Sequence, residues 1–160
     1  MTIPKEIWTL PRPRKPYYPG SFPLHFEKKL WRLLGEPKKV LHPFGGMAEI
    51  GDRVDLNPEV NPTWIGDAHN MDWIADNTYD LVICDPPYND KLSEELYNTP
   101  KIKYKKYINE AVRVCKSGGF VASYHWIWTI KPPKTTYYKI IVVLLGQNHR
   151  ARICCIYQKE

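Results

Sequence analysis

The sequence lacks the features that mark several common classes of protein. Its apolar runs are all far shorter than the roughly 20 residues that a helix needs to cross a membrane. Its first residues, MTIPKEIWTLPRPRKP, contain no apolar segment of the kind found in signal peptides. We therefore expect no membrane association and, by default, a cytoplasmic protein.

Cysteine is scarce and is not arranged for metal binding. The chain has 4 cysteines, none in a CxxC pair and none with a histidine at metal-ligand spacing. Cys84, Cys115, Cys154 and Cys155 adjoin apolar residues, an environment typical of buried, reduced thiols. We expect neither a redox centre nor a bound metal.

Two nucleotide-binding signatures are also missing. The sequence has no GxGxxG motif for a nicotinamide dinucleotide and no GxxxxGK motif for a nucleoside triphosphate. It therefore favours neither a dehydrogenase of the usual dinucleotide-binding type nor a P-loop enzyme.

Acidic residues are scarce everywhere except in the middle of the chain. Residues 1–40 carry 9 basic and 3 acidic side chains, residues 41–100 carry 2 and 12, and residues 101–160 carry 12 and 2. The net charge of +6 thus conceals a basic, acidic, basic order. Basic flanks suit a polyanion such as nucleic acid, and an acidic centre suits hydroxyl and amino donors. Solvated surfaces would give the same pattern, so charge alone leaves both readings open.

The 160 residues, 43% of them hydrophobic, are enough for one globular domain. The pattern predicts, in order, an extended basic proline-rich arm (1–20), a helix (24–34), strands (38–44, 52–59, 62–67 and 79–85), a helix (about 103–115), a strand (120–126) and an antiparallel strand pair (137–145 and 151–157). Gly35 is predicted to end the first helix, and Gly118 with Gly119 the second.

Strands that alternate with helices predict an open, mainly parallel α/β sheet. In such sheets, ligands bind outside the carboxyl ends of the strands. The predicted ends carry HPFGG, DLN, GDA and DPPY, which are all polar, glycine-rich or acidic. We expect the functional site there.

The segment DPPY, Asp85 to Tyr88, is suited to holding an exocyclic amino group of a nucleobase. The lone pair of such a nitrogen is delocalised into the ring, and acceptors on both N–H bonds free it for attack. The Asp85 carboxylate and the Pro86 carbonyl can be these acceptors, because consecutive prolines restrict the backbone. Tyr88 offers a face on which a base rotated out of a helix can stack.

DPPY resembles the catalytic motif of the S-adenosylmethionine-dependent amino-methyltransferases, which methylate adenine N6 or cytosine N4. YPGSFP (18–23) resembles their motif at the methionine end of the cofactor, and VLHPFGG (40–46) resembles their glycine-rich loop. The resemblance implies a Rossmann-like class I methyltransferase fold, S-adenosylmethionine as cofactor, and a catalytic set of Asp85, Pro86, Pro87 and Tyr88.

The resemblance also implies the cofactor site. Asp55 would hold the ribose hydroxyls, and Asp67 with Ala68 would recognise the adenine. The whole implied set is Ser21, Phe22, Pro23, Phe44, Gly45, Gly46, Asp55, Leu56, Asp67 and Ala68. No insertion is large enough for a separate target-recognition domain. Contacts with the target would then come from the arm and from residues 101–107 and 126–134, where basic and aromatic residues alternate.

The favoured function is that of a small DNA adenine-N6 methyltransferase of the phage or restriction–modification kind, which would act in the host cytoplasm if phage-encoded. The alternatives are an RNA methyltransferase acting on an adenine or guanine amino group, and a catalytically silent subunit that binds nucleic acid. A cytosine C5-methyltransferase does not fit, because it needs a cysteine nucleophile, typically in a Pro-Cys pair, and no cysteine here follows proline.

The chain departs from the family pattern at several positions. His42 stands where the family usually has an acid, and MAEIG (47–51) and VNPT (60–63) are too short for crossover helices. Part of the sheet would then lack a covering layer, so we expect a homodimer in which a second copy covers it. The alternative is that the proline-rich arm folds back over the gap.

Overall fold

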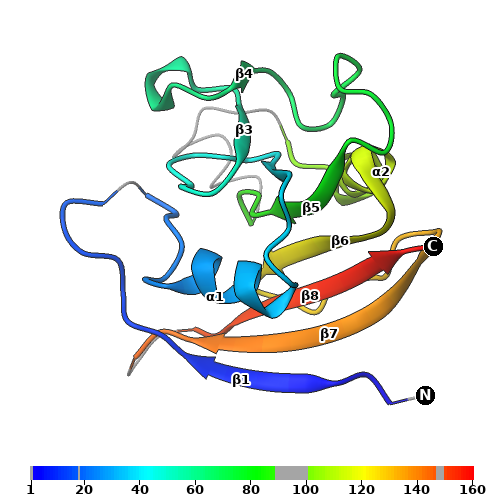
Figure 1. The fold of residues 1–160 in the computed structure, drawn as a ribbon. Helices are drawn as coiled ribbons and strands as arrows, with labels where there is room; N and C mark the ends of the chain where they lie inside the picture. The colour runs from blue at the N-terminus through cyan, green and yellow to red at the C-terminus, as the bar shows by residue number, and fades with distance from the viewer. Residues whose placement is uncertain (1, 18, 89–100, 147–149) are drawn as a thin grey trace.

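A computed structural model describes residues 2–17, 19–88, 101–146 and 150–160. An eight-stranded sheet runs through the molecule in the order β1-β7-β8-β6-β5-β2-β3-β4 (Figure 1). The strands are β1 (Lys5–Thr9), β2 (Val40–His42), β3 (Asp52–Asp55), β4 (Trp64–Ile65), β5 (Tyr79–Cys84), β6 (Cys115–His125), β7 (Thr135–Leu144) and β8 (Arg152–Lys159). The helices are α1 (Phe26–Leu33), α2 (Tyr104–Val114) and the short 3-10 helix η1 (Pro58–Val60).

The sheet is parallel from β4 through β3, β2 and β5 to β6. Strand β8 inserts antiparallel between β6 and β7, which places the C-terminal strand inside the sheet. The predicted parallel α/β sheet with a C-terminal antiparallel pair is therefore confirmed.

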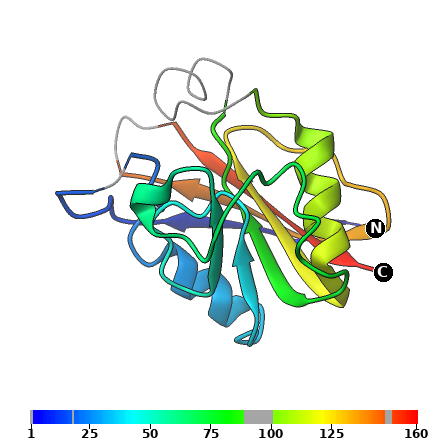
Figure 2. The same ribbon diagram turned by 90° about the horizontal axis from the view of Figure 1, so that it is seen from above.

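Helices α1 and α2 cover opposite faces of the sheet (Figure 2). On β5, Val82 and Cys84 belong to the core that contains α2, whereas Leu81 and Ile83 belong to the core that contains α1. This alternation explains the continuous apolar run of β5, because a strand that is buried on both faces has no solvent side. All four cysteines lie buried and unbridged in these layers.

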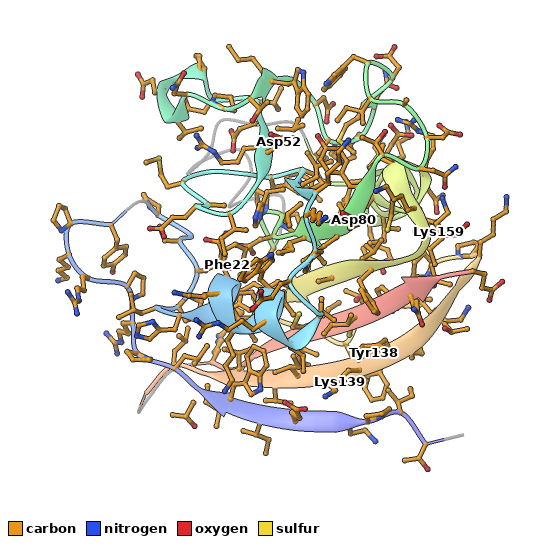
Figure 3. The ribbon with its side chains drawn as sticks, in the orientation of Figure 1. Phe22, Asp52, Asp80, Tyr138, Lys139 and Lys159 are labelled. Atoms are coloured by element: carbon orange, nitrogen blue, oxygen red, sulfur yellow. The ribbon has the colours of Figure 1, made fainter. Side chains whose placement is uncertain are left out.

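The amino-terminal arm differs from the prediction because part of it belongs to the sheet. Strand β1 pairs in parallel with β7, and an ion pair joins Glu6 to Lys139 across them (Figure 3). Ile7 is 70% exposed, whereas Trp8 is only 4% exposed and packs against α1. Proline restricts the chain to extended geometry but cannot donate within a ladder, which agrees with Pro4 and Pro11 flanking the strand.

Gly118 and Gly119 do not end the second helix, as the sequence had suggested. Helix α2 ends at Val114 and β6 begins at the next residue, so the two glycines lie inside the strand. The pairing of β5 with β6 shifts register in this stretch, and Gly118 has a φ of +77°. A left-handed residue inside a strand is typical of a bulge, and glycine adopts that conformation without a steric penalty.

The connections between β2, β3 and β4 contain no α-helix, and the structure describes every residue in them. The expectation of truncated crossovers is therefore confirmed. Strand β1 lies at the edge of the sheet opposite β4, so this part of the arm does not cover the gap. Neither described α-helix is long and apolar enough to span a bilayer.

Candidate functional site

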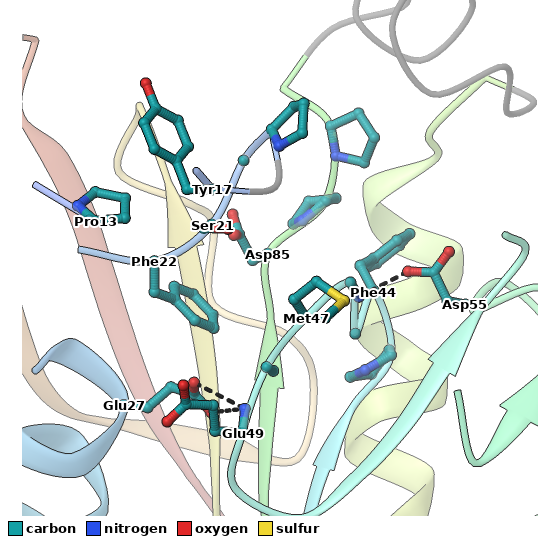
Figure 4. Close-up of a pocket in the computed structure, with 18 of the residues that line it drawn as sticks. Pro13, Tyr17, Ser21, Phe22, Glu27, Phe44, Met47, Glu49, Asp55 and Asp85 are labelled. Carbon is teal, nitrogen blue, oxygen red and sulfur yellow. Dashed lines mark hydrogen bonds between the residues drawn. The ribbon is translucent and has the colours of Figure 1, made fainter. Parts of the chain in front are cut away.

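A cavity of about 1320 Å³ opens at the carboxyl ends of β2, β3, β4 and β5 (Figure 4). Every residue of the implied catalytic and cofactor sets lines it. The loops after these strands supply Phe44, Gly45, Gly46, Asp55, Leu56, Asp67, Ala68 and the DPPY segment, and the segment before α1 supplies Ser21, Phe22 and Pro23. Tyr18, which belongs to the YPGSFP motif, lies outside the described residues.

The glycine-rich loop is held tightly against β3. The Gly45 N–H donates to the Val54 carbonyl at 2.9 Å, and a Cβ at Gly45 would lie 2.5 Å from the Cβ of Arg53. Such a contact is not tolerated, so only glycine allows the loop to approach β3 this closely. Packing against β3 alone requires glycine at this position, whether or not a ligand is bound.

Asp55 is fixed by its own neighbourhood. Its Oδ2 accepts from the Gly46 N–H at 2.8 Å, and its Oδ1 accepts from the Asn57 N–H at 2.9 Å. Each carboxylate oxygen can accept more than one hydrogen bond. Asp55 therefore faces the cavity as a pre-oriented acceptor for hydroxyl donors.

Asp67 is held in a second hydrogen-bonded turn. Its Oδ1 accepts from the His69 backbone N–H at 2.9 Å and lies 2.6 Å from His69 Nδ1. On the other side of the ring, His69 Nε2 accepts from the Lys103 N–H at 2.9 Å, which assigns the proton to Nδ1. His69 thus links the loop after β4 to the start of α2, a role that the sequence analysis missed.

The DPPY segment follows β5 directly and closes one end of the cavity. The Tyr88 hydroxyl donates to Asp85 Oδ1 at 3.1 Å, so Oδ2 has no partner from this tyrosine. Burial raises the pKa of Asp85 to about 7, although the hydrogen bond from Tyr88 and the charge of Arg152 act in the opposite direction. Asp85 is consequently a carboxyl group that changes its protonation state near neutral pH.

Tyr88 lies in a cluster of aromatic and cationic side chains. Its ring stacks on Trp126 with centroids 6.0 Å apart and packs edge-on against His125 at 5.1 Å. The guanidinium carbon of Arg152 lies 4.9 Å from the centroid of the same ring. The basic and aromatic residues 126–134 were predicted to contact the target, but Arg152 was not predicted, because it begins the largely buried strand β8 and has no motif around it.

Glu27 is a further residue whose role the sequence did not reveal. It projects from α1 to the cavity wall, where its Oε1 lies 3.2 Å from Nε2 of His42 and both its oxygens accept from the Glu49 N–H. Burial opposes ionisation, but the hydrogen bonds outweigh it and lower the pKa of Glu27 below its usual range. An acid from α1 therefore lies beside His42, which stands where the amino-methyltransferases that the motifs resemble usually have an acid.

No protein-family model matches the chain, and no curated protein sequence matches it. Several solved structures, however, superpose on the chain. TrmN from Thermus thermophilus superposes with a TM-score of 0.61 at 20% identity over 89% of this chain, which spans 50% of that protein's length. Burkholderia thailandensis 1,6-didemethyltoxoflavin-N1-methyltransferase, solved with S-adenosylhomocysteine, has a TM-score of 0.57 at 12% identity over 82% of this chain and 75% of its own.

An rRNA methylase from Streptococcus thermophilus has a TM-score of 0.54 at 12% identity, over 87% of this chain and 97% of its own. At such identities the likeness establishes the fold alone. The chain therefore has the Rossmann-like fold of the class I methyltransferases, as the motifs had implied.

Proposed function

We propose that the protein transfers a methyl group from S-adenosylmethionine to an exocyclic amino group of a nucleobase, and that adenine N6 in DNA is the target. The observation that carries this proposal is the meeting of DPPY with Asp55, Asp67 and the glycine-rich loop around a single cavity. Its volume of about 1320 Å³ exceeds the usual range for one small ligand and leaves room for a cofactor together with a base.

The chemistry of the cavity wall suits S-adenosylmethionine. The fixed carboxylate of Asp55 matches a pair of ribose hydroxyls, because it accepts and cannot donate. Phe44 packs edge-on against Tyr107 with centroids 5.1 Å apart and gives an apolar wall for a planar base. When bound, the cofactor supplies an electrophilic methyl group on a sulfonium.

The chain's own contribution is to hold the target nitrogen. Asp85 would accept one N–H of the amino group through Oδ2, since Tyr88 uses Oδ1. The Pro86 carbonyl would accept the second N–H, and Pro87 restricts the backbone that aims this carbonyl. A pKa of about 7 also allows Asp85 to take the surplus proton that methyl transfer leaves on the nitrogen.

An RNA amino group is the second candidate target. The rRNA methylase among the structural neighbours has this fold at only 12% identity. It therefore supports an RNA substrate through the fold alone, as it does methyl transfer. Exposed basic residues that line the cavity, among them Arg14 and Lys28, suit the phosphates of either polymer.

Incubation with tritiated S-adenosylmethionine and with DNA or RNA, single- and double-stranded, tests the proposal. Digestion to nucleosides should place the label on N6-methyladenine from DNA. Label only in RNA would transfer the proposal to the second candidate. No transfer to any polymer, despite cofactor binding, would support a silent subunit and overturn the proposal.

We also propose that a second copy of the chain covers the edge of the sheet at β4. Ile65 on this edge strand is exposed, and so is Trp73, whose ring lies over Gly66. An edge strand with exposed apolar side chains is favourable for self-association.

A further inference from the structure

Arg152 occupies a position beside the DPPY segment that the proposed mechanism does not yet use. It begins β8, the strand that pairs with β6, and its side chain lines the cavity. Its Nη1 donates to the Arg150 carbonyl at 3.2 Å, while its guanidinium carbon lies 4.9 Å from the centroid of the Tyr88 ring. The guanidinium is thus held between the Arg150 carbonyl and the ring of Tyr88, whose hydroxyl donates to Asp85.

We propose that Arg152 is a positioning residue, which fixes the ring of Tyr88 and favours the ionised form of the Asp85 carboxyl group, so that it can accept a hydrogen bond from the target amine. The role of Asp85 as an acceptor rests on the proposed function. The influence of Arg152 on Tyr88 and Asp85 does not, because it follows from the ligand-free geometry.

The charges around Asp85 support this role. The titratable groups that interact with it, among the described residues, are Cys84 on its own strand, Tyr88, Tyr107 on α2, Tyr124 on β6, and Cys154 and Arg152 on β8. Burial raises the pKa of each of these phenols and thiols, so they stay neutral at neutral pH. Arg152 is the charged member of this set, and it favours the ionised carboxylate.

The geometry of Tyr88 supports the same role. A guanidinium over an aromatic face is attracted by the ring's quadrupole, and the attraction grows when water is excluded. The ring is also in contact with Trp126 and His125, so its orientation is fixed by three partners. That orientation directs the hydroxyl to Asp85. Burial and the charge of Arg152 lower the pKa of His125 to about 4, so His125 adds no charge at neutral pH.

Arg150 provides a matched control two residues away. Its guanidinium carbon lies 5.9 Å from the centroid of the Trp126 ring, and the side chain is exposed. It is absent from the groups that act on the pKa of Asp85. Arg150→Gln removes the same charge from the same surface as Arg152→Gln, and differs from it in the contact with Tyr88.

The experiment is a titration of the ligand-free protein labelled with ¹³C at the aspartate carboxyl carbon, followed by NMR. Asp85→Ala identifies the resonance. Arg152→Gln should move the midpoint of Asp85 upward by about one pH unit, the scale on which a single neighbouring charge acts. Arg152→Lys, which retains the charge, and Arg150→Gln should leave the midpoint close to that of the parent. An Asp85 midpoint that is unchanged in Arg152→Gln would overturn the proposal.

Kinetics give the second readout. For Arg152→Gln, kcat should fall most near pH 7 and recover as the pH rises, with KM for nucleic acid little changed. Arg150→Gln should change KM and not the pH profile. The same changes in both variants would show that Arg152 only binds phosphate, and would overturn the proposal. A parent protein without methyl transfer would contradict the proposed function, yet the titration would still decide the role of Arg152.

Discussion

The acidic and basic halves of the sheet hold their charged side chains in different ways. Residues 41–100, which hold β2 to β5, carry 2 basic and 12 acidic side chains, whereas residues 101–160, which hold β6 to β8, carry 12 and 2. In the acidic half, backbone N–H groups fix the carboxylates of Asp55 and Asp67. In the basic half, the guanidinium groups of Arg150 and Arg152 lie over aromatic rings.

The difference lies in how far along the chain each contact reaches. Asp55 is bonded to residues nine positions before it and two after it, within one loop system. Arg152 meets Tyr88 only because β8 inserts next to β6. Short-range contacts make a rigid receptor, which suits one small molecule of constant shape. Exposed cations on long side chains, such as Arg150, adapt to a flexible polymer. The two regions should therefore respond separately to mutation.

Asp85→Ala is expected to give the largest difference between the effect on methyl transfer and the effect on cofactor affinity. Removal of the acceptor should lower methyl transfer by about 100- to 1000-fold, the usual consequence of deleting one group that stabilises a transition state. Affinity for S-adenosylmethionine should change little, because the fixed carboxylates of the acidic half remain. Single-turnover assays and calorimetry measure the two effects. A variant with substantial activity would exclude the proposed role of Asp85 in holding the target amine.

The second prediction concerns pH. An ionised Asp85 carboxylate is needed to accept the hydrogen bond from the target amine, and burial raises the pKa of Asp85 to about 7. Consequently, kcat/KM should fall about tenfold for each pH unit below that value. Stability should respond in the opposite direction. The folded pKa lies above the unfolded value of 3.8, so the contribution of Asp85 to stability is complete at low pH and lost as the pH rises through 7.

Asp85→Ala should therefore stabilise the fold more at pH 8 than at pH 5, relative to the parent. Thermal unfolding at both pH values measures the difference. Equal changes at both pH values would mean that the carboxyl group titrates in the folded protein as it does in the unfolded chain.

At the other end of the cavity, Asp55→Ala should weaken S-adenosylmethionine binding by about 1–3 kcal/mol, the cost of losing an acceptor for buried donors. The affinity for nucleic acid should stay near that of the parent. Glu59→Ala is the control, since Glu59 is a nearby exposed acid on η1 that does not line the cavity. Unchanged calorimetric affinity in Asp55→Ala would remove this residue from the cofactor site.

These predictions reflect what the sequence could and could not reveal. The parallel strands and the cavity residues were predictable, because apolar runs end in short polar motifs whose partners lie in the same loop. Strand β1 was hidden, since Lys5 and Glu6 disguise an edge strand in which only Trp8 is deeply buried. Glu27 and Arg152 were hidden for a different reason. Each reaches the site through tertiary packing, which no local pattern records.

A smaller effect is expected from the basic half. Nucleic-acid binding should weaken with salt, and Lys103→Ala, Lys105→Ala and Lys106→Ala together should reduce the log–log slope by about 0.9 for each phosphate that the variant no longer neutralises. All three side chains are exposed at the start of α2. Lys38→Ala with Lys39→Ala is the control, because these residues precede β2, at the end of the sheet away from the cavity. An unchanged slope in the triple variant would place the nucleic-acid surface elsewhere.

The smallest effect on catalysis is expected at the free edge of the acidic half. If a second copy covers β4, light scattering at micromolar concentration should give twice the monomer mass of 18.8 kDa. Ile65→Glu should restore the monomer, because a charge at an exposed edge position disfavours strand-to-strand association. Methyl transfer should change less than about twofold, since Ile65 does not line the cavity and surface substitutions away from a site have small effects. A parent that scatters as a monomer while it methylates would exclude the dimer and leave the exposed edge without a partner of its own kind.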